Sequence, residues 1–192
     1  EALYSNTTGY ANTASGKDAL YSNTTGHSNT ATGSSALNSN TTASYNTSYG
    51  YEALKSNTIG IDNTATGYRA SYLNTTGYSN TASGVGALYA NTTGTKNIGI
   101  GYTAGDAITT GSNNTIIGDL PGSTTLADTI LIAAGTTERI KVDATGLYIN
   151  GTLMSGGGGG GATDIDGLSD GHYNSTAGSL GLGTGALSSE DV

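Results

Sequence analysis

The chain has no cysteine, phenylalanine or tryptophan, and it has one proline and one methionine among 192 residues. Without cysteine it can form no disulfide framework and offers no thiol chemistry, so stability must come from backbone pairing, repetition and association. Hydrophobic residues amount to 34% and few of them are large, which leaves little material for a conventional globular core. The same scarcity is typical of disordered chains, and only strict regularity in the remaining residues argues against disorder.

Basic residues are also scarce: there are six Lys and Arg against 14 Asp and Glu, which gives a formal charge of −8. Phosphate-binding surfaces need clustered Lys and Arg, so neither nucleic acid nor an anionic membrane is expected as a partner. No apolar run has the length of a membrane helix, and the first residues do not form a signal peptide, so no membrane insertion is expected. Because Glu1-Ala2-Leu3 matches the mid-unit Glu52-Ala53-Leu54, we expect the natural polypeptide to extend further toward the N-terminus.

What the chain does contain is one 17-residue unit, repeated seven times between residues 2 and 119. The alanine that opens each unit keeps this spacing without a slip, at Ala2, Ala19, Ala36, Ala53, Ala70, Ala87 and Ala104. Two asparagine series share the register: Asn6, Asn23, Asn40, Asn57, Asn74 and Asn91, then Asn12, Asn29, Asn46, Asn63, Asn80 and Asn97, with Asn114 continuing the second. Glycine closes both halves of the unit. Such self-similarity is the signature of a stacked repeat architecture.

The length and composition of the unit predict an all-β chain, a parallel β-solenoid or β-roll of 17-residue coils. Seventeen residues are too few for a helix and its return, and Asn, Thr, Ser and Gly favour turns or extended backbone over helix interiors. We expect two strands in each coil, Leu-Tyr-Ser-Asn-Thr and Asn-Thr-Ala-x-Gly, with glycines of positive φ at both corners. The pattern does not determine the handedness of the coil.

Stacking places equivalent residues above one another, so the asparagines are expected to form hydrogen-bonded ladders along the axis and the threonines beside them to pair similarly. Alanine and leucine then point inward and form one thin apolar layer. Such a layer yields about 25 cal/mol per Å² against ordering costs of about 1 to 2 kcal/mol per residue, which makes a single chain marginal. We therefore predict an intertwined homotrimer in which the leucine column faces the threefold axis.

The pattern changes after Asn97, where isoleucine replaces smaller residues at Ile98, Ile100, Ile108, Ile116 and Ile117, as expected for a coil that seals a solenoid. We divide the chain into a repeat solenoid at 1–120, a small β-rich domain at 121–155, a glycine linker at 156–162, and a loop with the start of a second repeat stack at 163–192. The 121–155 segment reads as a β-meander with one charged and one buried face. The glycine run is either flexible or packed about a symmetry axis.

Three phrases carry a family resemblance: A-L-Y-S-N-T-T-G-x-x-N-T-A-S-G, I-G-I-G-Y-x-A-G, and G-T-T-E-R-I-K-V-D-A-T-G-L-Y-I-N-G-T. Together with A-T-D-I-D-G-L-S-D-G near the C-terminus, they resemble tail-fibre and tailspike proteins of bacteriophages, with those of cyanobacterial hosts coming nearest. The repeats are also similar to the head β-rolls of trimeric autotransporter adhesins, although the 17-residue unit is longer than theirs. The first resemblance implies a parallel homotrimeric fibre in the virion, with other fibre or tail proteins as partners.

Catalysis has little support in the sequence, and we expect neither an enzyme nor a cofactor. The two histidines, His27 and His172, occupy a variable slot of the repeat and a Gly-Asp-rich loop, without a converging nucleophile and acid. Asp164, Asp166 and Asp170 form a weak calcium candidate, because carboxylates at alternate positions can converge on a hard cation. That segment lacks the distal glutamate of an EF-hand, and Asp-Gly is an ordinary turn.

Three clustered tyrosines, Tyr45, Tyr49 and Tyr51, are a weak candidate for binding host cell-surface glycan, because amphipathic rings suit wet contacts with sugars. The plainer alternative is that they fill space between the chains of a trimer. Two functions follow from the sequence. One is a structural shaft of a viral tail fibre that projects a receptor-binding tip, and the other is an adhesin head on a bacterial cell surface that binds glycan through exposed tyrosines.

Overall fold

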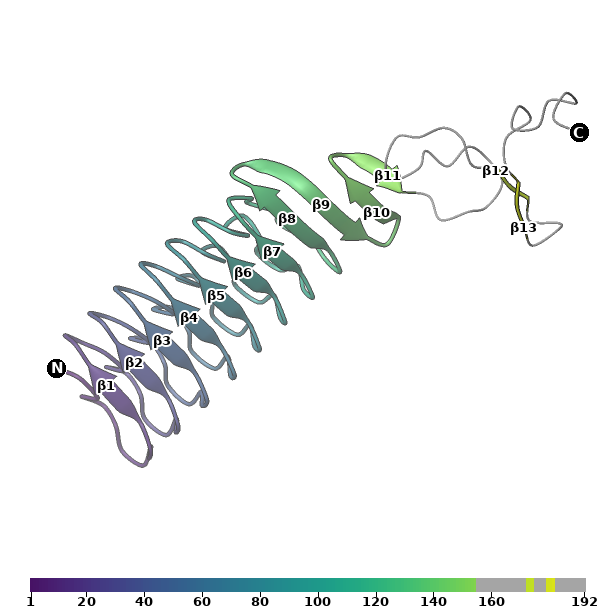
Figure 1. Ribbon diagram of the computed structural model, residues 1–192. Coiled ribbons are helices and arrows are strands. Elements are labelled where there is room, and N and C mark those ends of the chain that lie inside the picture. Colours follow the sequence, from purple (N-terminus) through teal and green to yellow (C-terminus); the bar gives the residue numbers. More distant parts are fainter. Residues whose placement is uncertain (155–171, 175–178, 182–192) are drawn as a thin grey trace, which may run out of the picture.

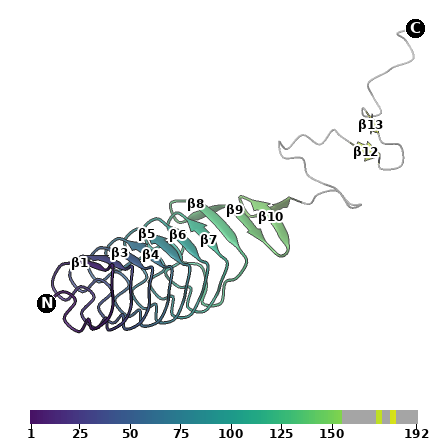
Figure 2. The ribbon, with the colours of Figure 1, turned by 90° about the horizontal axis from the view of Figure 1, so that it is seen from below.

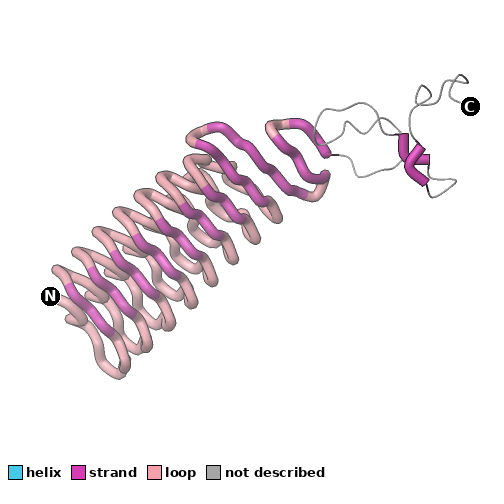
Figure 3. Tube along the Cα trace, viewed as in Figure 1, coloured by secondary structure: helices cyan, strands magenta, loops and turns pink. Residues whose placement is uncertain are grey.

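The computed structural model describes residues 1–154, 172–174 and 179–181, and every regular element in those residues is a β-strand. Seven short strands, one from each repeat, lie along a rod-like stack (Figures 1 and 3). They are β1 (Thr13–Ser15), β2 (Thr30–Thr32), β3 (Thr47–Tyr49), β4 (Thr64–Thr66), β5 (Thr81–Ser83), β6 (Ile98–Ile100) and β7 (Thr115–Ile117). They are followed by β8 (Ile130–Ala134), β9 (Thr137–Asp143), β10 (Gly146–Ile149), β11 (Thr152–Met154), β12 (His172–Asn174) and β13 (Ser179–Gly181).

The repeat strands pair in parallel, each with the strand of the next coil. Thr13 pairs with Thr30 and Ala14 with Ala31, and the same 17-residue displacement persists to the pairing of β6 with β7. Seen from below, the coils form a continuous tube (Figure 2). The predicted fold class, a parallel β-solenoid with coils of 17 residues, is therefore confirmed.

The prediction of two strands per coil is wrong, because the Leu-Tyr-Ser-Asn segment forms turns. Leu20, Leu37 and Leu54 all have φ near +50°, in the left-handed region. This conformation costs about 1 to 2 kcal/mol for a residue with a side chain, but it turns leucine into the coil. The segment still bonds to the next coil without being extended, since the Leu20 N–H donates to Ala36 O at 3.0 Å.

The two glycine columns meet different constraints, and only one has the predicted positive φ. Gly16 has φ +131°, and its equivalents in the other coils are also positive. Gly9 and its equivalents are not in that region; instead, a Cβ on Gly9 would lie 2.3 Å from Gly26 O and 2.4 Å from Asn6 Oδ1. The neighbouring coil and an asparagine side chain crowd the Cβ position in this second column, which favours glycine, although Ala43 occupies the equivalent slot of the third coil.

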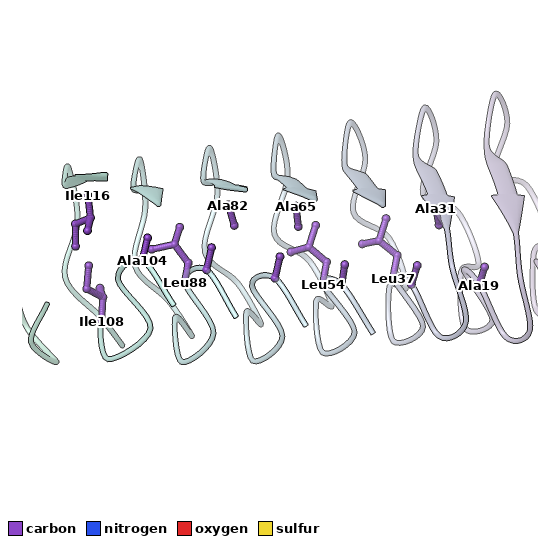
Figure 4. Close-up of a cluster of buried hydrophobic side chains, with 14 of the residues drawn as sticks. Ala19, Ala31, Leu37, Leu54, Ala65, Ala82, Leu88, Ala104, Ile108 and Ile116 are labelled. Carbon is purple, nitrogen blue, oxygen red and sulfur yellow. The ribbon is translucent and has the colours of Figure 1, made fainter. Parts of the chain in front are cut away.

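The core is a column of alanine and leucine inside the single chain (Figure 4). Leu20, Leu37, Leu54 and Leu88 are fully buried, as are the alanines that open and line the inner coils. The predicted inward direction of these residues is confirmed. The further expectation that leucine faces a threefold axis is wrong, because leucine already fills the interior of its own coil.

The seventh coil rearranges this core. Gly105 takes the place of the leucine, and the volume is supplied by Ile108, which replaces the laddered asparagine, and Ile116, which replaces the strand alanine. Both isoleucines are fully buried, and a Cβ on Gly105 would lie 3.3 Å from each of their Cδ1 atoms. Of the five isoleucines predicted to seal the solenoid, Ile108 and Ile116 are buried in the core. The other three, Ile98, Ile100 and Ile117, are 37 to 42% exposed.

The stack does not end at residue 120. Strand β8 pairs in parallel with β7, although the displacement shortens to 15 residues between Thr115 and Ile130. Strands β9, β10 and β11 then add in antiparallel order to the same 11-stranded sheet, so the predicted meander exists but continues the solenoid sheet. The expected buried face of the meander is only half-buried, at Ile140 and Val142.

Most of the predicted linker and second stack, 156–192, lies outside the described residues. Within that range, the structure describes β12 and β13, which pair antiparallel to each other. Across the described parts of the chain, no helix is long and apolar enough to cross a membrane.

Ser71 interrupts the leucine column and gives a test of the core. Its Oγ is buried without a hydrogen-bond partner, and its φ of 49° matches the 50° of Leu54. We expect Ser71→Leu to raise the free energy of unfolding by about 1 to 3 kcal/mol, because it removes an unsatisfied hydroxyl and adds buried apolar area. The matched reverse change, Leu54→Ser, should lower it by about 2 to 5 kcal/mol. Denaturant titration followed by circular dichroism measures both, and a destabilised Ser71→Leu would show that leucine does not fit there.

Candidate functional site

Two buried asparagine ladders are the most extensive side-chain arrangement of the described residues. In the first, the Asn40 Nδ2 donates to Asn23 Oδ1 at 2.8 Å and to the carbonyl of Ala43 in its own coil at 3.0 Å. The same pair of bonds recurs in each inner coil. The predicted ladder of Asn6, Asn23, Asn40, Asn57, Asn74 and Asn91 is confirmed by these hydrogen bonds.

The second ladder uses the backbone as well as the side chains. The Asn46 N–H donates to Asn29 Oδ1 at 3.0 Å, and the Asn46 Nδ2 donates to the same oxygen at 3.3 Å and to Gly60 O at 2.9 Å. Each amide therefore contacts the coil before it and the coil after it. The backbone bonds of this ladder join all of its members: Asn12, Asn29, Asn46, Asn63, Asn80, Asn97 and Asn114.

The ladders also show where asparagine is chemically required. From Asn23 to Asn114, the asparagines of both columns are at most 1% exposed. A buried amide needs partners for its carbonyl and its NH₂ group, and a stack of identical amides at one coil spacing supplies both. Sequons such as Asn23-Thr24-Thr25 are thus a product of the ladder, because the asparagine lies inside.

The threonine column bonds differently from the expected pairing. The Thr24 Oγ1 donates to the backbone carbonyl of Thr41 at 3.0 Å rather than to its hydroxyl. The bond recurs from Thr7 to Thr109 and runs beside the backbone bonds between the same coils. Three polar columns therefore tie each coil to the next.

A charged and aromatic cluster, which the sequence analysis missed, lies at one corner of the fourth and fifth coils. The Glu52 side chain is 7% exposed and accepts hydrogen bonds from Lys55 Nζ at 2.6 Å and Arg69 Nε at 2.7 Å. The Arg69 guanidinium carbon lies 5.1 Å and 5.3 Å from the ring centroids of Tyr68 and Tyr72. The repeat register could have indicated this cluster, because Glu52 and Arg69 are one 17-residue repeat apart and Glu52 and Lys55 are one turn apart.

The tyrosines of this corner form stacks along the rod. Tyr51 stacks on Tyr68 with ring centroids 5.4 Å apart, and Tyr72 stacks on Tyr89 at 5.2 Å. Stacking at the coil spacing covers ring faces with other rings or with the guanidinium. Each stack thus covers one face of each ring, and the Arg69 guanidinium lies over Tyr68 and Tyr72.

The structure does not gather the three glycan-candidate tyrosines into one site. Tyr45 precedes β3, Tyr49 is its last residue, and Tyr51 follows Gly50, with exposed fractions of 57%, 60% and 45%. Tyr45 lies edge-on to His27 at 4.9 Å, whereas Tyr51 stacks on Tyr68. All three are exposed, but they lie before, in and after one strand, and Tyr45 and Tyr51 make aromatic contacts with different partners.

The histidine candidate His27 lies beside an aromatic ring and a hydroxyl group. His27 stacks on Tyr10 at 4.7 Å, and its Nδ1 lies 3.3 Å from Ser28 Oγ. Asp164, Asp166 and Asp170 lie outside the described residues, so the calcium prediction remains a prediction. Among the described residues, no three His, Cys, Asp or Glu side chains come together in a group that could hold a metal ion.

The ladder predicts a large difference between buried and exposed asparagines. Asn57→Asp should lower the free energy of unfolding by about 3 kcal/mol or more at neutral pH, because a buried carboxylate loses both donor bonds and faces the Oδ1 of a neighbour. Asn150→Asp, at an exposed position where the side-chain oxygen accepts from Arg139 Nη1 at 3.2 Å, is the matched control and should change it by about 0.5 kcal/mol or less. Equal effects in denaturant titrations would argue against the ladder as a stabilising element.

The Glu52 cluster predicts a pH dependence. Hydrogen bonds from Lys55 and Arg69 hold the pKa of Glu52 below its ordinary value of 4.5, although burial opposes the shift. A lowered folded pKa means that the stabilisation is present above the ordinary value and lost as the pH falls below it. Glu52→Gln should cost about 1 to 2 kcal/mol at neutral pH, since both cations are partly exposed, and nothing at pH values well below the ordinary pKa. Thermal unfolding across this pH range, with Asp62→Asn as the exposed control, would contradict the cluster if the Glu52→Gln difference were independent of pH.

Comparisons with protein-family models, with curated protein sequences and with solved structures return no significant match.

Proposed function

We propose that this chain is a shaft segment of a homotrimeric bacteriophage tail fibre, which holds a receptor-binding tip away from the virion. Its role is mechanical rather than catalytic. The observation that carries the proposal is that the first asparagine ladder runs from Asn6 to Asn91 without a gap, and the second ladder and the threonine column continue through all seven coils. Other fibre or tail proteins are the expected partners at its ends.

The ladders support a stiff rod for a simple geometric reason. Bending the stack would lengthen hydrogen bonds on one side of every coil, and those bonds are buried and have no water to replace them. From Ala2 to Ala104 the stack makes six steps of about 4.8 Å, which gives a section of roughly 30 Å. Repetition of such coils extends length without changing the cross-section, as a spacer requires.

The resemblance of the repeat phrases to phage tail fibres supports the virion as the location. The rival function is a bacterial surface adhesin, and one observation favours it: Tyr45 and Tyr49 expose 57% and 60% of their surface. Against it, the stacked tyrosines at the neighbouring corner each have one ring face covered by the other ring of the pair. We therefore place the shaft first and keep a cell-surface adhesin as the alternative.

Location is tested on native particles. We expect an antibody against residues 1–154 to label projections of phage particles in electron micrographs and to leave the host envelope unlabelled. Labelling confined to the envelope of cells without phage would contradict the shaft and favour the adhesin. Pre-absorption of the antibody with purified chain is the control.

The two functions also differ in what the exposed tyrosines do. We expect Tyr45→Ser, Tyr49→Ser and Tyr51→Ser together to leave host-cell and glycan binding within about twofold of the original chain, because a shaft does not contact the receptor. Glycan arrays and cell-binding assays measure this, with circular dichroism to show that the fold is kept. Loss of binding in a folded variant would contradict the shaft and support the adhesin.

A further inference from the structure

The outward face of the sheet changes character along the rod. In β1 to β5 the outward positions are threonine or serine, apart from Tyr49, while the central residue of each strand points into the core. In β6, β7 and β8 most outward positions are aliphatic, with Thr115 between Ile98 and Ile130. Ile98, Ile100, Ile117 and Ile130 are each exposed by 37 to 42%. Monomeric proteins rarely leave such a series of large apolar side chains uncovered.

Strand register places these side chains in two continuous rows. In the first row, Ile130 pairs with Val142, Val142 with Leu147, and Leu147 with Met154. In the second, Ile100 pairs with Ile117, Ile117 with Ile132, Ile132 with Ile140, and Ile140 with Ile149. Paired residues lie on the same face of a sheet. We call this surface the aliphatic face: Ile98, Ile100, Ile117, Ile130, Ile132, Ile140, Val142, Leu147, Ile149 and Met154.

The charged residues of the meander lie on the opposite side. Lys141 pairs with Leu131, whose side chain is in the core, and Lys141 Nζ lies 2.7 Å from Asp143 Oδ2. A register shift after Ile132 sets Glu138 opposite Ala133, and Glu138 lines a small pocket with Leu131 and Lys141. The usual pattern of a solenoid, apolar inside and polar outside, is therefore inverted in β9 and β10.

We propose that the aliphatic face is the surface through which copies of this chain associate. This inference takes from the proposed function only the number of associating copies, which is three. The ten side chains present on the order of 500 Å² of apolar surface, near the upper limit for monomers, and two such faces together reach the roughly 1,000 Å² at which specific interfaces begin. Two such flat rows can interdigitate as packed sheets do, at a separation of about 10 Å.

A second copy fits this face better than a charged partner. The chain carries a formal charge of −8, so copies repel one another wherever acidic residues meet. The aliphatic face has no charged residue in either row, and association there keeps the acidic side chains apart. The aliphatic face also takes the role that the sequence assigned to the leucine column at the threefold axis. Leucine cannot make that contact, because it is buried within its own coil.

The test uses substitutions that the repeat itself accepts. Ile98→Thr, Ile100→Ser and Ile117→Thr restore the residues of earlier coils, such as Thr81 and Ser83, so the coils should stay folded. We expect the complete chain to sediment as a trimer and the triple variant to raise the dissociation constant by about tenfold or more. Thr32→Ser, Thr64→Ser and Thr66→Ser, on the hydroxyl part of the same sheet, should leave it unchanged. Ile140→Thr with Ile149→Thr should weaken association in the same way.

Protection of a single thiol gives a second measurement, because the chain contains no cysteine. Ile117→Cys should react with a maleimide about tenfold more slowly in the assembled chain than after dilution to monomer, whereas Thr47→Cys should react at one rate in both. A monomeric wild-type chain would overturn the inference. So would an assembly that the aliphatic variants do not weaken and in which Ile117→Cys stays reactive, and that second result would leave the proposed shaft standing. Failure of particle labelling would remove the shaft without affecting the interface.

Discussion

The hydrogen bond between one buried asparagine and the next, one coil away, is the interaction on which the rest of the structure depends. An amide in the interior has two donors and a carbonyl to satisfy, and no water to satisfy them. The stack meets this demand only if the next amide lies at the coil spacing and in the same orientation. An insertion of one residue in any coil would leave Asn57 or its equivalents without partners on one side. The constant 17-residue spacing is therefore a consequence of the buried amides.

The same bond explains the unusual backbone around it. The carbonyl of Gly26 accepts hydrogen bonds from Asn12 and Asn23, and a Cβ on Gly9 would lie 2.3 Å from that oxygen. Glycine at position 9 is thus favoured by the crowding around the ladder, although Ala43 stands at the equivalent position of the third coil, whereas glycine at position 16 is a requirement of backbone conformation. Leucine pays a different cost: its left-handed φ is offset by complete burial in a coil that has room for one large side chain. Polar ladder and apolar column divide a small interior between them.

These relations explain how far the sequence could predict the structure. Period and composition were enough for the fold class, for both asparagine ladders and for the inward direction of Ala19 and Leu20, because each follows from stacking identical units. The prediction of a strand over the Leu-Tyr-Ser-Asn segment was wrong. Its residues are compatible with a β-strand, and the sequence does not reveal the left-handed φ of leucine, which only the closed coil imposes. The Glu52 cluster was missed because it belongs to one corner of two coils and not to the repeat. The sequence also could not predict which face of the meander lies on the core side. Apolar and charged residues such as Ile140 and Lys141 alternate in the same way whichever face is turned inward.

The end of the repeat and the aliphatic face have a common cause. At the seventh coil Ile108 replaces the laddered asparagine, so the first ladder has no amide with which to continue, although the buried Asn114 still extends the second ladder at that level. The next displacement shortens to 15 residues, and after β8 the chain turns back on itself instead of closing another coil. A sheet that no longer encloses an interior has no inner core to cover its apolar residues. Its apolar rows therefore lie on the outward side, where β6 and β7 already carry isoleucine, and within residues 1–154 the five most exposed members of these rows remain 37 to 42% exposed. The place where one chain stops winding around its own core is thus the place where packing between chains has most to gain.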